Sequence, residues 1–277
     1  MIDGACVFHR ASGSARCTLH HALGHAALPL ACRQFPRVVV VDPRGVSVTL
    51  SHYCPTAAAM LETTAPIAIV TDADAFPPGG EYVGLDVRDG LPPALRPDML
   101  MGWEDWWHWE EQAVALLSAV DDAADALARL AHAVEFTRDW RPADGPLRDR
   151  IDAAFQSARH DTPARVATAC RSDDAMADVV AAVPDGMRGD ARRAIGTRGA
   201  RVPIHVHRHL LIAHAFANWT AHIGEGLRTW LRSIETAHAL LLSGLGVRDV
   251  DLLLRHLVDP RALARRWVDV EGNKREV

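Results

Sequence analysis

The sequence almost lacks lysine: of its 30 basic residues, only Lys274 is a lysine. Three kinds of chemistry depend on a lysine inside the fold: the Walker lysine of phosphate-binding loops, the Schiff-base lysine and the lysine amine nucleophile. A lone lysine so near the end of the sequence excludes all three. The remaining positive charge comes from arginine, which is always protonated and carries none of this chemistry.

Long apolar runs are also missing. No run approaches the roughly 20 apolar residues that cross a bilayer, so we expect no membrane span. The first residues, MIDGACVFHR, lack the basic start and apolar core of a signal peptide, and the expected location is the cytoplasm. The formal net charge of −5 gives no general attraction to phosphates, so nucleic acid is not an expected partner.

The composition is otherwise ordinary for a globular protein, with 49% hydrophobic and 23% charged residues in 277. Such a length allows one large domain or two modest ones, each able to bury a core without a metal. Any metal site would therefore be a local feature of the fold.

Cysteines are concentrated near the start: four of the five, Cys6, Cys17, Cys32 and Cys54, precede residue 58. In a cytoplasmic chain thiols stay reduced, so such a cluster favours metal ligation over disulfides. Four thiolates suit a structural Zn²⁺ or an iron–sulfur cluster, and ligand type does not separate the two. The alternative is that the cysteines are small, inert core residues.

A β-hairpin is predicted inside this region. RVVVVD (residues 37–42) and GVSVTLS (residues 45–51) are β-branched runs separated by Pro43 and Arg44. Antiparallel pairing brings the two ends of a hairpin together. Cys32 and Cys54, just outside the two strands, could therefore share one site.

The rest of the chain favours helices. After Cys54 a short helix is predicted to about residue 62, and residues 63–100 are a Pro- and Gly-rich covering segment with a strand candidate at 67–70. Apolar residues at helical spacing follow. They predict helices over residues 103–137, 147–159, 163–183, 203–243, 248–258 and 260–267, with an Arg- and Gly-rich break over 186–201 and possible interruptions at Gly224 and Gly226.

The expected fold class is mainly α with a small β-hairpin. We expect three parts along the chain: a cysteine-cluster module (1–62), the covering segment (63–100) and a helical domain (101–270). Hydrolase chemistry has no support, because no nucleophile-elbow sequence is present.

Several other side chains are candidates for binding. Histidines near the cysteines could replace a thiolate, and two more stand four residues apart on a predicted helix; they are His9, His20, His21, His25, His52, His205 and His209. The aromatic run of Trp103, Trp106, Trp107 and Trp109 could stack on a ligand or join two parts of the fold. Arg228 could meet an acidic group, and Cys170 is expected in the core.

One set of residues carries a resemblance. The run DGAC-V-F, Cys17 followed by Leu19 and His20, then Pro29 ahead of Cys32-Arg33-x-Phe35-Pro36, resembles the bacterial cysteine-cluster proteins described as zinc- or iron-chelating, a family that includes the flagellin lysine N-methylases. The resemblance implies that Cys6, Cys17 and Cys32 are ligands. The family's leading cysteine run has no counterpart in this sequence. Either the true start lies upstream and carries further cysteines, or Cys54 or a histidine completes the set.

Three functions follow as expectations. The first is a metal- or iron–sulfur-binding protein acting in metal handling, redox or protein interaction. The second, implied by the resemblance, is a lysine N-methylase-like enzyme that uses S-adenosylmethionine on a partner protein; no strand here is followed by the glycine-rich turn that holds this cofactor in doubly wound methyltransferases. The third is a helical interaction protein without metal.

Overall fold

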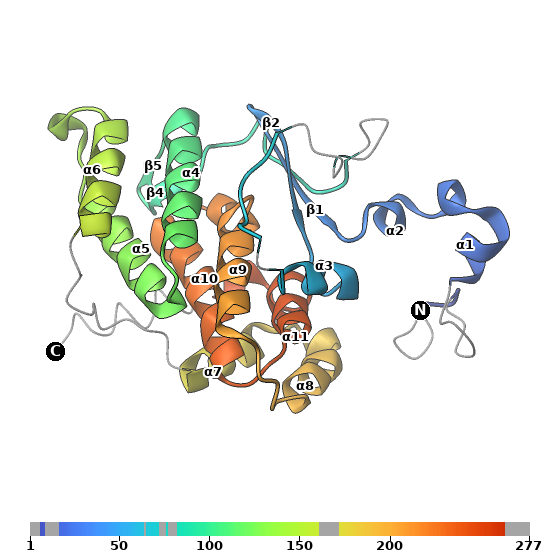
Figure 1. Cartoon of the computed structure of the whole chain (residues 1–277). Coiled ribbons are helices and arrows are strands. Elements are labelled where there is room, and N and C mark those ends of the chain that lie inside the picture. The colour runs from blue at the N-terminus through green and yellow to red at the C-terminus, as the bar shows by residue number, and fades with distance from the viewer. Residues whose placement is uncertain are drawn as a thin grey trace.

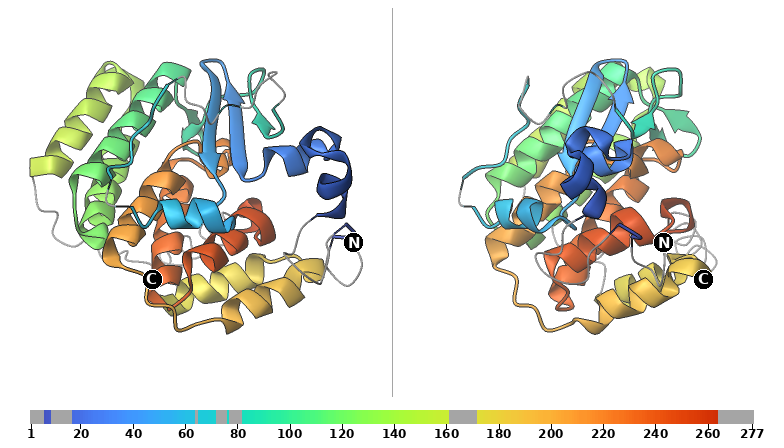
Figure 2. Two further views of the ribbon diagram at one scale, coloured as in Figure 1. Left: turned by 45° about the vertical axis from the view of Figure 1, so that its right-hand side comes forward. Right: turned by 90° about the vertical axis from the view of Figure 1, so that its right-hand side faces the viewer.

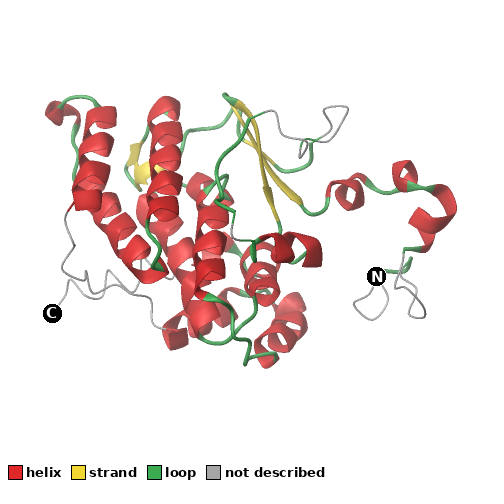
Figure 3. Ribbon diagram, viewed as in Figure 1, coloured by secondary structure: helices red, strands yellow, loops and turns green. Residues whose placement is uncertain are grey.

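A computed structural model describes residues 6–8, 17–63, 65–71, 76, 82–160 and 172–263. The mainly helical fold with small sheets is confirmed (Figure 1, Figure 3). The short N-terminal elements are α1 (Thr18–Leu23), the 3₁₀ turn η1 (His25–Ala27), α2 (Leu30–Gln34), β1 (Arg37–Asp42), β2 (Gly45–Leu50) and α3 (Pro55–Met60).

The predicted hairpin is confirmed. β1 and β2 pair antiparallel from Arg37 opposite Leu50 to Asp42 opposite Gly45. β3 (Leu85–Asp86) adds to β1 in parallel, which gives the strand order β2-β1-β3. Gly84 permits this approach, since a Cβ there would lie 2.3 Å from the Val39 carbonyl oxygen.

The segment expected to be irregular is mostly so. The strand predicted over residues 67–70 is wrong: these residues have no regular structure, although Ile67 packs on the helical core and its carbonyl accepts from the Ser118 hydroxyl. A small sheet of β4 (Ala94–Arg96) and β5 (Met99–Leu100) ends the segment.

The helical body comprises everything after β5 in the described part of the chain. Its helices are α4 (Trp103–Ala119), α5 (Ala123–Arg138), α6 (Leu147–His160), α7 (Ser172–Ala182), α8 (Arg188–Gly196), α9 (Ile204–Ala215), α10 (Leu227–Leu242) and α11 (Val247–Leu252), with short turns η2 (Pro142–Asp144), η3 (Asp185–Met187) and η4 (Trp219–Ile223). The π-helical turn η5 (Leu253–Leu257) follows α11 directly.

Two predicted helices are broken in the structure. The helix expected over 103–137 divides into α4 and α5, because Val120 is extended and the Asp122 carboxylate accepts the Asp125 N–H as an N-cap. The helix expected over 203–243 ends at Ala215 and resumes after Gly226, whose φ is +87°. A Cβ at Gly226 would also lie 2.7 Å from the Arg96 Cα, so this glycine allows close packing against β4.

One helix was missed. The Arg- and Gly-rich stretch expected to be a break contains α8, whose buried face is formed by small residues, Ala191 and Ala194. Its apolar signal is too weak to recognise from the sequence.

The body has two apolar clusters that share α9 and α10. The first lies among α4, α5 and α6 and includes the fully buried Trp109, Trp230 and Phe155. The second packs α7, α8 and α11 around Leu210 and Leu240. In Figures 1 and 2 these helices form one mass, with the hairpin on its surface and α1 and α2 extending away from it.

Candidate functional site

The four predicted metal-ligand cysteines are free thiols that reach solvent. Cys6 and Cys32 are exposed, and Cys17 and Cys54 are half-buried. Cys17 is the N-cap of α1 and Cys54 the N-cap of α3, and neither side chain makes a capping hydrogen bond. Cys170 and His9 lie outside the described residues.

Three of the elements near these cysteines form what we term the arm, residues 17–34. α1 and η1 bury no residue, and in α2 only Gln34 is buried. The Gln34 side-chain oxygen accepts the Val83 N–H at 2.7 Å, which fastens the arm at its hairpin end. Hydrophobic burial therefore contributes almost nothing to the order of the arm.

The hairpin brings the flanks of Cys32 and Cys54 to one end. At its open end the Ser51 N–H donates to the Pro36 carbonyl at 2.7 Å, one step beyond the Arg37–Leu50 pair. Cys32 precedes this end from the arm, and Cys54 follows it at the start of α3. This neighbourhood agrees with the sequence argument; the shared site itself stays a prediction.

Within the described ranges, no three His, Cys, Asp or Glu side chains form a group that could hold a metal ion. The His20 and His25 rings lie with centroids 6.0 Å apart on the arm, where both side chains are exposed. On α9, His209 Nδ1 lies 2.8 Å from the Leu61 carbonyl, as expected for a histidine that fastens two segments. The cysteines and histidines are thus present but not gathered around one point.

A buried carboxylate organises the segment immediately before Cys54. Asp251 on α11 has no solvent exposure. It accepts from the Ser51 hydroxyl at 2.7 Å, from the Tyr53 N–H at 3.1 Å and from Arg255 Nε at 2.9 Å. One side chain thereby fixes the residues that lead into Cys54 to a helix about 200 positions later in the chain.

Two buried histidines face the same carboxylate. His52 Nδ1 lies 3.6 Å and His214 Nε2 3.5 Å from Asp251 Oδ1, and neither nitrogen has a hydrogen-bond partner in the described part of the chain. Burial, with the nearby Arg255 charge, lowers the pKa of His214 to about 4. Burial alone would raise the pKa of Asp251, but the two imidazoles and Arg255 hold it well below its usual range.

This cluster is not a hydrolytic triad, although it contains serine, histidine and aspartate. The Ser51 hydroxyl donates to Asp251, so the His256 Nε2 at 2.8 Å acts as donor to the same Oγ and not as a base. Ser51 is also only 1% exposed, which leaves no room for a substrate carbonyl. The network fixes the position of the Cys54 segment instead.

A second ion pair, with a buried carboxylate and a half-buried arginine, fastens the hairpin tip to the body. Arg44 donates to Glu110 at 2.7 Å, and the other Glu110 oxygen accepts the Ala217 N–H at 2.8 Å. Burial raises the pKa of Glu110, although Arg44 opposes this shift. Trp107 Nε1 donates to Asp42 at 3.1 Å, so this aromatic residue joins α4 to the hairpin.

Three of the remaining candidates, Trp106, Trp109 and Arg228, make contacts within the fold. Trp106 and Trp109 are buried in the body core. Arg228, for which the sequence left an acidic partner open, donates through two nitrogens to Glu135 at 2.7 Å. Neither Asp251 nor Glu110 was identified from the sequence, because isolated acidic residues in helices give no signal of burial.

Comparison of the chain with protein-family models, curated proteins and solved structures gives no match. The resemblance to the cysteine-cluster family therefore stays a prediction. Among the described helices, none is long and apolar enough to cross a membrane.

Proposed function

We propose that this chain is a cytoplasmic metal-binding protein in which Cys6, Cys17, Cys32 and Cys54 hold a Zn²⁺ ion or an iron–sulfur cluster. The observation that carries the proposal is the solvent access of all four thiols. Inert structural cysteines are among the most buried residues in proteins, and exposed free thiols are otherwise a liability. A chelating role gives these positions a chemical reason.

The four thiolates are suitable ligands for such a metal. To share one metal ion, the arm must move toward Cys54. Four thiolates are the ligands of closed zinc sites and of iron–sulfur clusters. Metal binding to separated ligands provides folding free energy of its own. This free energy would order a segment that buries almost no apolar surface.

Cys54 differs from the other three cysteines because the residues before it are bound to the helical body. Its backbone N–H donates to Ser51, and both Ser51 and Tyr53 are bound to Asp251. Cys17 and Cys32 lie on the arm. A shared metal would therefore link the arm to the body, and the closed arm would present a new surface to a protein partner.

The test is metal analysis with an absorption spectrum on protein purified without oxygen. We expect near-stoichiometric zinc, or iron with a visible charge-transfer band, in the wild type. Cys32→Ser should lose most of the metal, whereas the matched control Cys170→Ser should retain it. Wild-type protein without metal, or equal loss in both variants, would contradict the proposal.

A further inference from the structure

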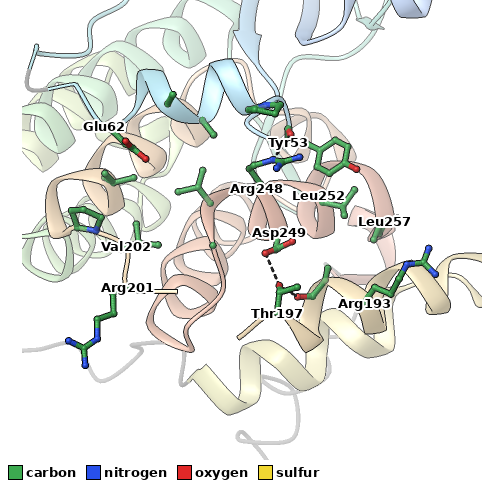
Figure 4. Close-up of a pocket in the computed structure, with 18 of the residues that line it drawn as sticks. Tyr53, Glu62, Arg193, Thr197, Arg201, Val202, Arg248, Asp249, Leu252 and Leu257 are labelled. Atoms are coloured by element: carbon green, nitrogen blue, oxygen red, sulfur yellow. Dashed lines mark hydrogen bonds between the residues drawn. The ribbon is translucent and has the colours of Figure 1, made fainter. Parts of the chain in front are cut away.

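A cavity of about 970 Å³ opens beside the Cys54 segment (Figure 4). Its walls come from α3 and, much later in the sequence, from α8, the start of α9 and α11. Tyr53 and Pro55, the two neighbours of Cys54, both line it. The volume suits a small organic molecule, and apolar cavities of this size are the usual form of ligand sites.

Apolar side chains form about half of the wall. Val202 and Val206 contribute from the α9 side, and Leu252 and Leu257 from the α11 side. Small side chains on α3 and α8, Ala58 and Ala194, keep the centre open. A ligand with a hydrocarbon body would gain free energy by leaving water for this surface.

Some of the polar and charged groups on the wall interact with one another. Arg193 forms an ion pair with Asp190. Asp249 accepts the Thr197 hydroxyl at 2.8 Å, a contact drawn in Figure 4. These contacts engage two of the acidic groups in the cavity.

Arg248 is different. Its Nε donates to the Tyr53 carbonyl at 3.1 Å, and its guanidinium lies 5.5 Å from the centre of the Tyr53 ring. These two contacts fix the side chain, and Figure 4 shows it between Tyr53 and Asp249. Its two terminal nitrogens have no acceptor in the described part of the chain. A guanidinium held in this way is prepared to bind a carboxylate through two parallel hydrogen bonds.

The remaining acidic group restricts the ligand. Glu62, at the α3 side of the cavity, has no cationic partner in the described ranges and would repel a second negative charge. Arg201 also lines the cavity, but Figure 4 shows its side chain directed away from the other labelled residues, so the cavity favours one anionic head and an uncharged body.

We propose that this cavity binds a monocarboxylate with an apolar chain, its carboxylate on Arg248 and its chain against Val202, Val206 and Leu252. Because Tyr53 and Pro55 form part of the wall, the bound molecule would lie against the loop that carries Cys54. The proposal does not rest on the metal centre, since none of the four candidate cysteines lines the cavity.

The experiment is calorimetric titration of the full chain with sodium octanoate and, separately, with 1-octanol. The two probes share a hydrocarbon chain and differ in charge. We expect octanoate to bind roughly threefold more tightly, the contribution of a solvent-screened ion pair. Arg248→Ala should remove this preference without abolishing octanol binding, and Arg248→Lys should restore part of it.

Arg192→Ala is the matched control, because Arg192 is an exposed arginine on α8 that does not line the cavity. It should leave both affinities unchanged. Equal affinity for octanoate and octanol, no binding of either probe, or an equal loss of preference in Arg192→Ala would overturn the proposal. Far-ultraviolet circular dichroism identifies any variant that fails to fold. If Arg248→Ala fails to fold, the preference of Arg248→Lys for octanoate tests the proposal.

Discussion

The arm and the helical body are ordered by different forces. The body encloses fully buried side chains such as Trp109, Trp230 and Phe155, whereas α1 and η1 of the arm bury none. The same contrast holds for polar groups, since the body holds a buried carboxylate at Asp251 and the arm presents cysteines and histidines to solvent. The core provides stability, and the solvent-exposed cysteines and histidines lie where the core is absent.

Acidification should affect the body far more than the arm. Burial lowers the pKa of His214, His222 and His238 to about 4 each. Their folded pKa values lie below the unfolded value of about 6.5, so their contribution to stability is complete above pH 6.5 and is lost as pH falls from there toward 4. We expect the free energy of unfolding to drop by on the order of 5 kcal/mol between pH 7 and pH 4.5.

Urea denaturation at a series of pH values measures this loss. His238→Gln should reduce the pH dependence, whereas His21→Gln on the exposed arm should leave it unchanged. A free energy of unfolding that stays flat from pH 7 to 5 would show that the buried histidines are not held neutral.

Truncation of one large side chain in the body and one in the arm should give different losses of stability. Trp109 is 0% exposed, and Trp109→Ala should cost about 4 kcal/mol of stability through the cavity that it leaves. Leu23 on the arm is 67% exposed, and Leu23→Ala should change stability by less than about 0.5 kcal/mol. Chemical denaturation gives both values. A loss of stability above about 1 kcal/mol for Leu23→Ala would show that the arm packs against the body, which would contradict this contrast.

The buried carboxylate gives a third prediction. Asp251→Asn leaves the Arg255 guanidinium, which is 12% exposed, without its charged partner, and should cost about 3 kcal/mol. Asp249→Asn on the same helix keeps an amide oxygen that can accept the Thr197 hydroxyl and leaves no buried charge unpaired, so it should cost about 1 kcal/mol or less. Thermal unfolding compares the two. Equal losses would mean that Asp251 does not have the special role assigned to it.

Two glycines with positive φ make the smallest test. Gly226→Ala brings a Cβ within 2.7 Å of the β4 backbone, whereas Gly24→Ala on the arm meets no atom within 4 Å. Both substitutions carry backbone strain of about 1–3 kcal/mol, and the clash should add about 2 kcal/mol at Gly226 alone. Similar melting temperatures for the two variants would contradict the close packing of α10 on β4.

Local patterns predicted much of this fold. The β-branched runs around Pro43 predicted the hairpin, and helical spacing located most of the body helices but not all of their breaks, nor α8; residues 163–171 of one predicted helix lie outside the described residues. The breaks after Ala119 and Ala215 were missed or only suspected, because apolar spacing continues across both. The first break is set by the N-cap at Asp122, and the second by the approach of Gly226 to β4. Only the second can be recognised in the sequence, from its glycine.

The candidate site was harder to predict. The cysteines are visible as residue types, but the Asp251 network joins positions about 200 residues apart and has no local pattern. The cavity beside Tyr53 likewise depends on how α3, α8, α9 and α11 meet. Such features follow from tertiary packing, which single-sequence periodicity does not contain.

The most direct test of the account is amide hydrogen exchange over the arm, residues 17–34, with and without bound metal. If the four cysteines share a metal, exchange in the arm should slow many-fold on metal binding, whereas exchange in the α4 and α10 core should stay as it was. Metal-loaded protein whose arm exchanges as fast as the metal-free chain would contradict the claim that the metal links the arm to the body.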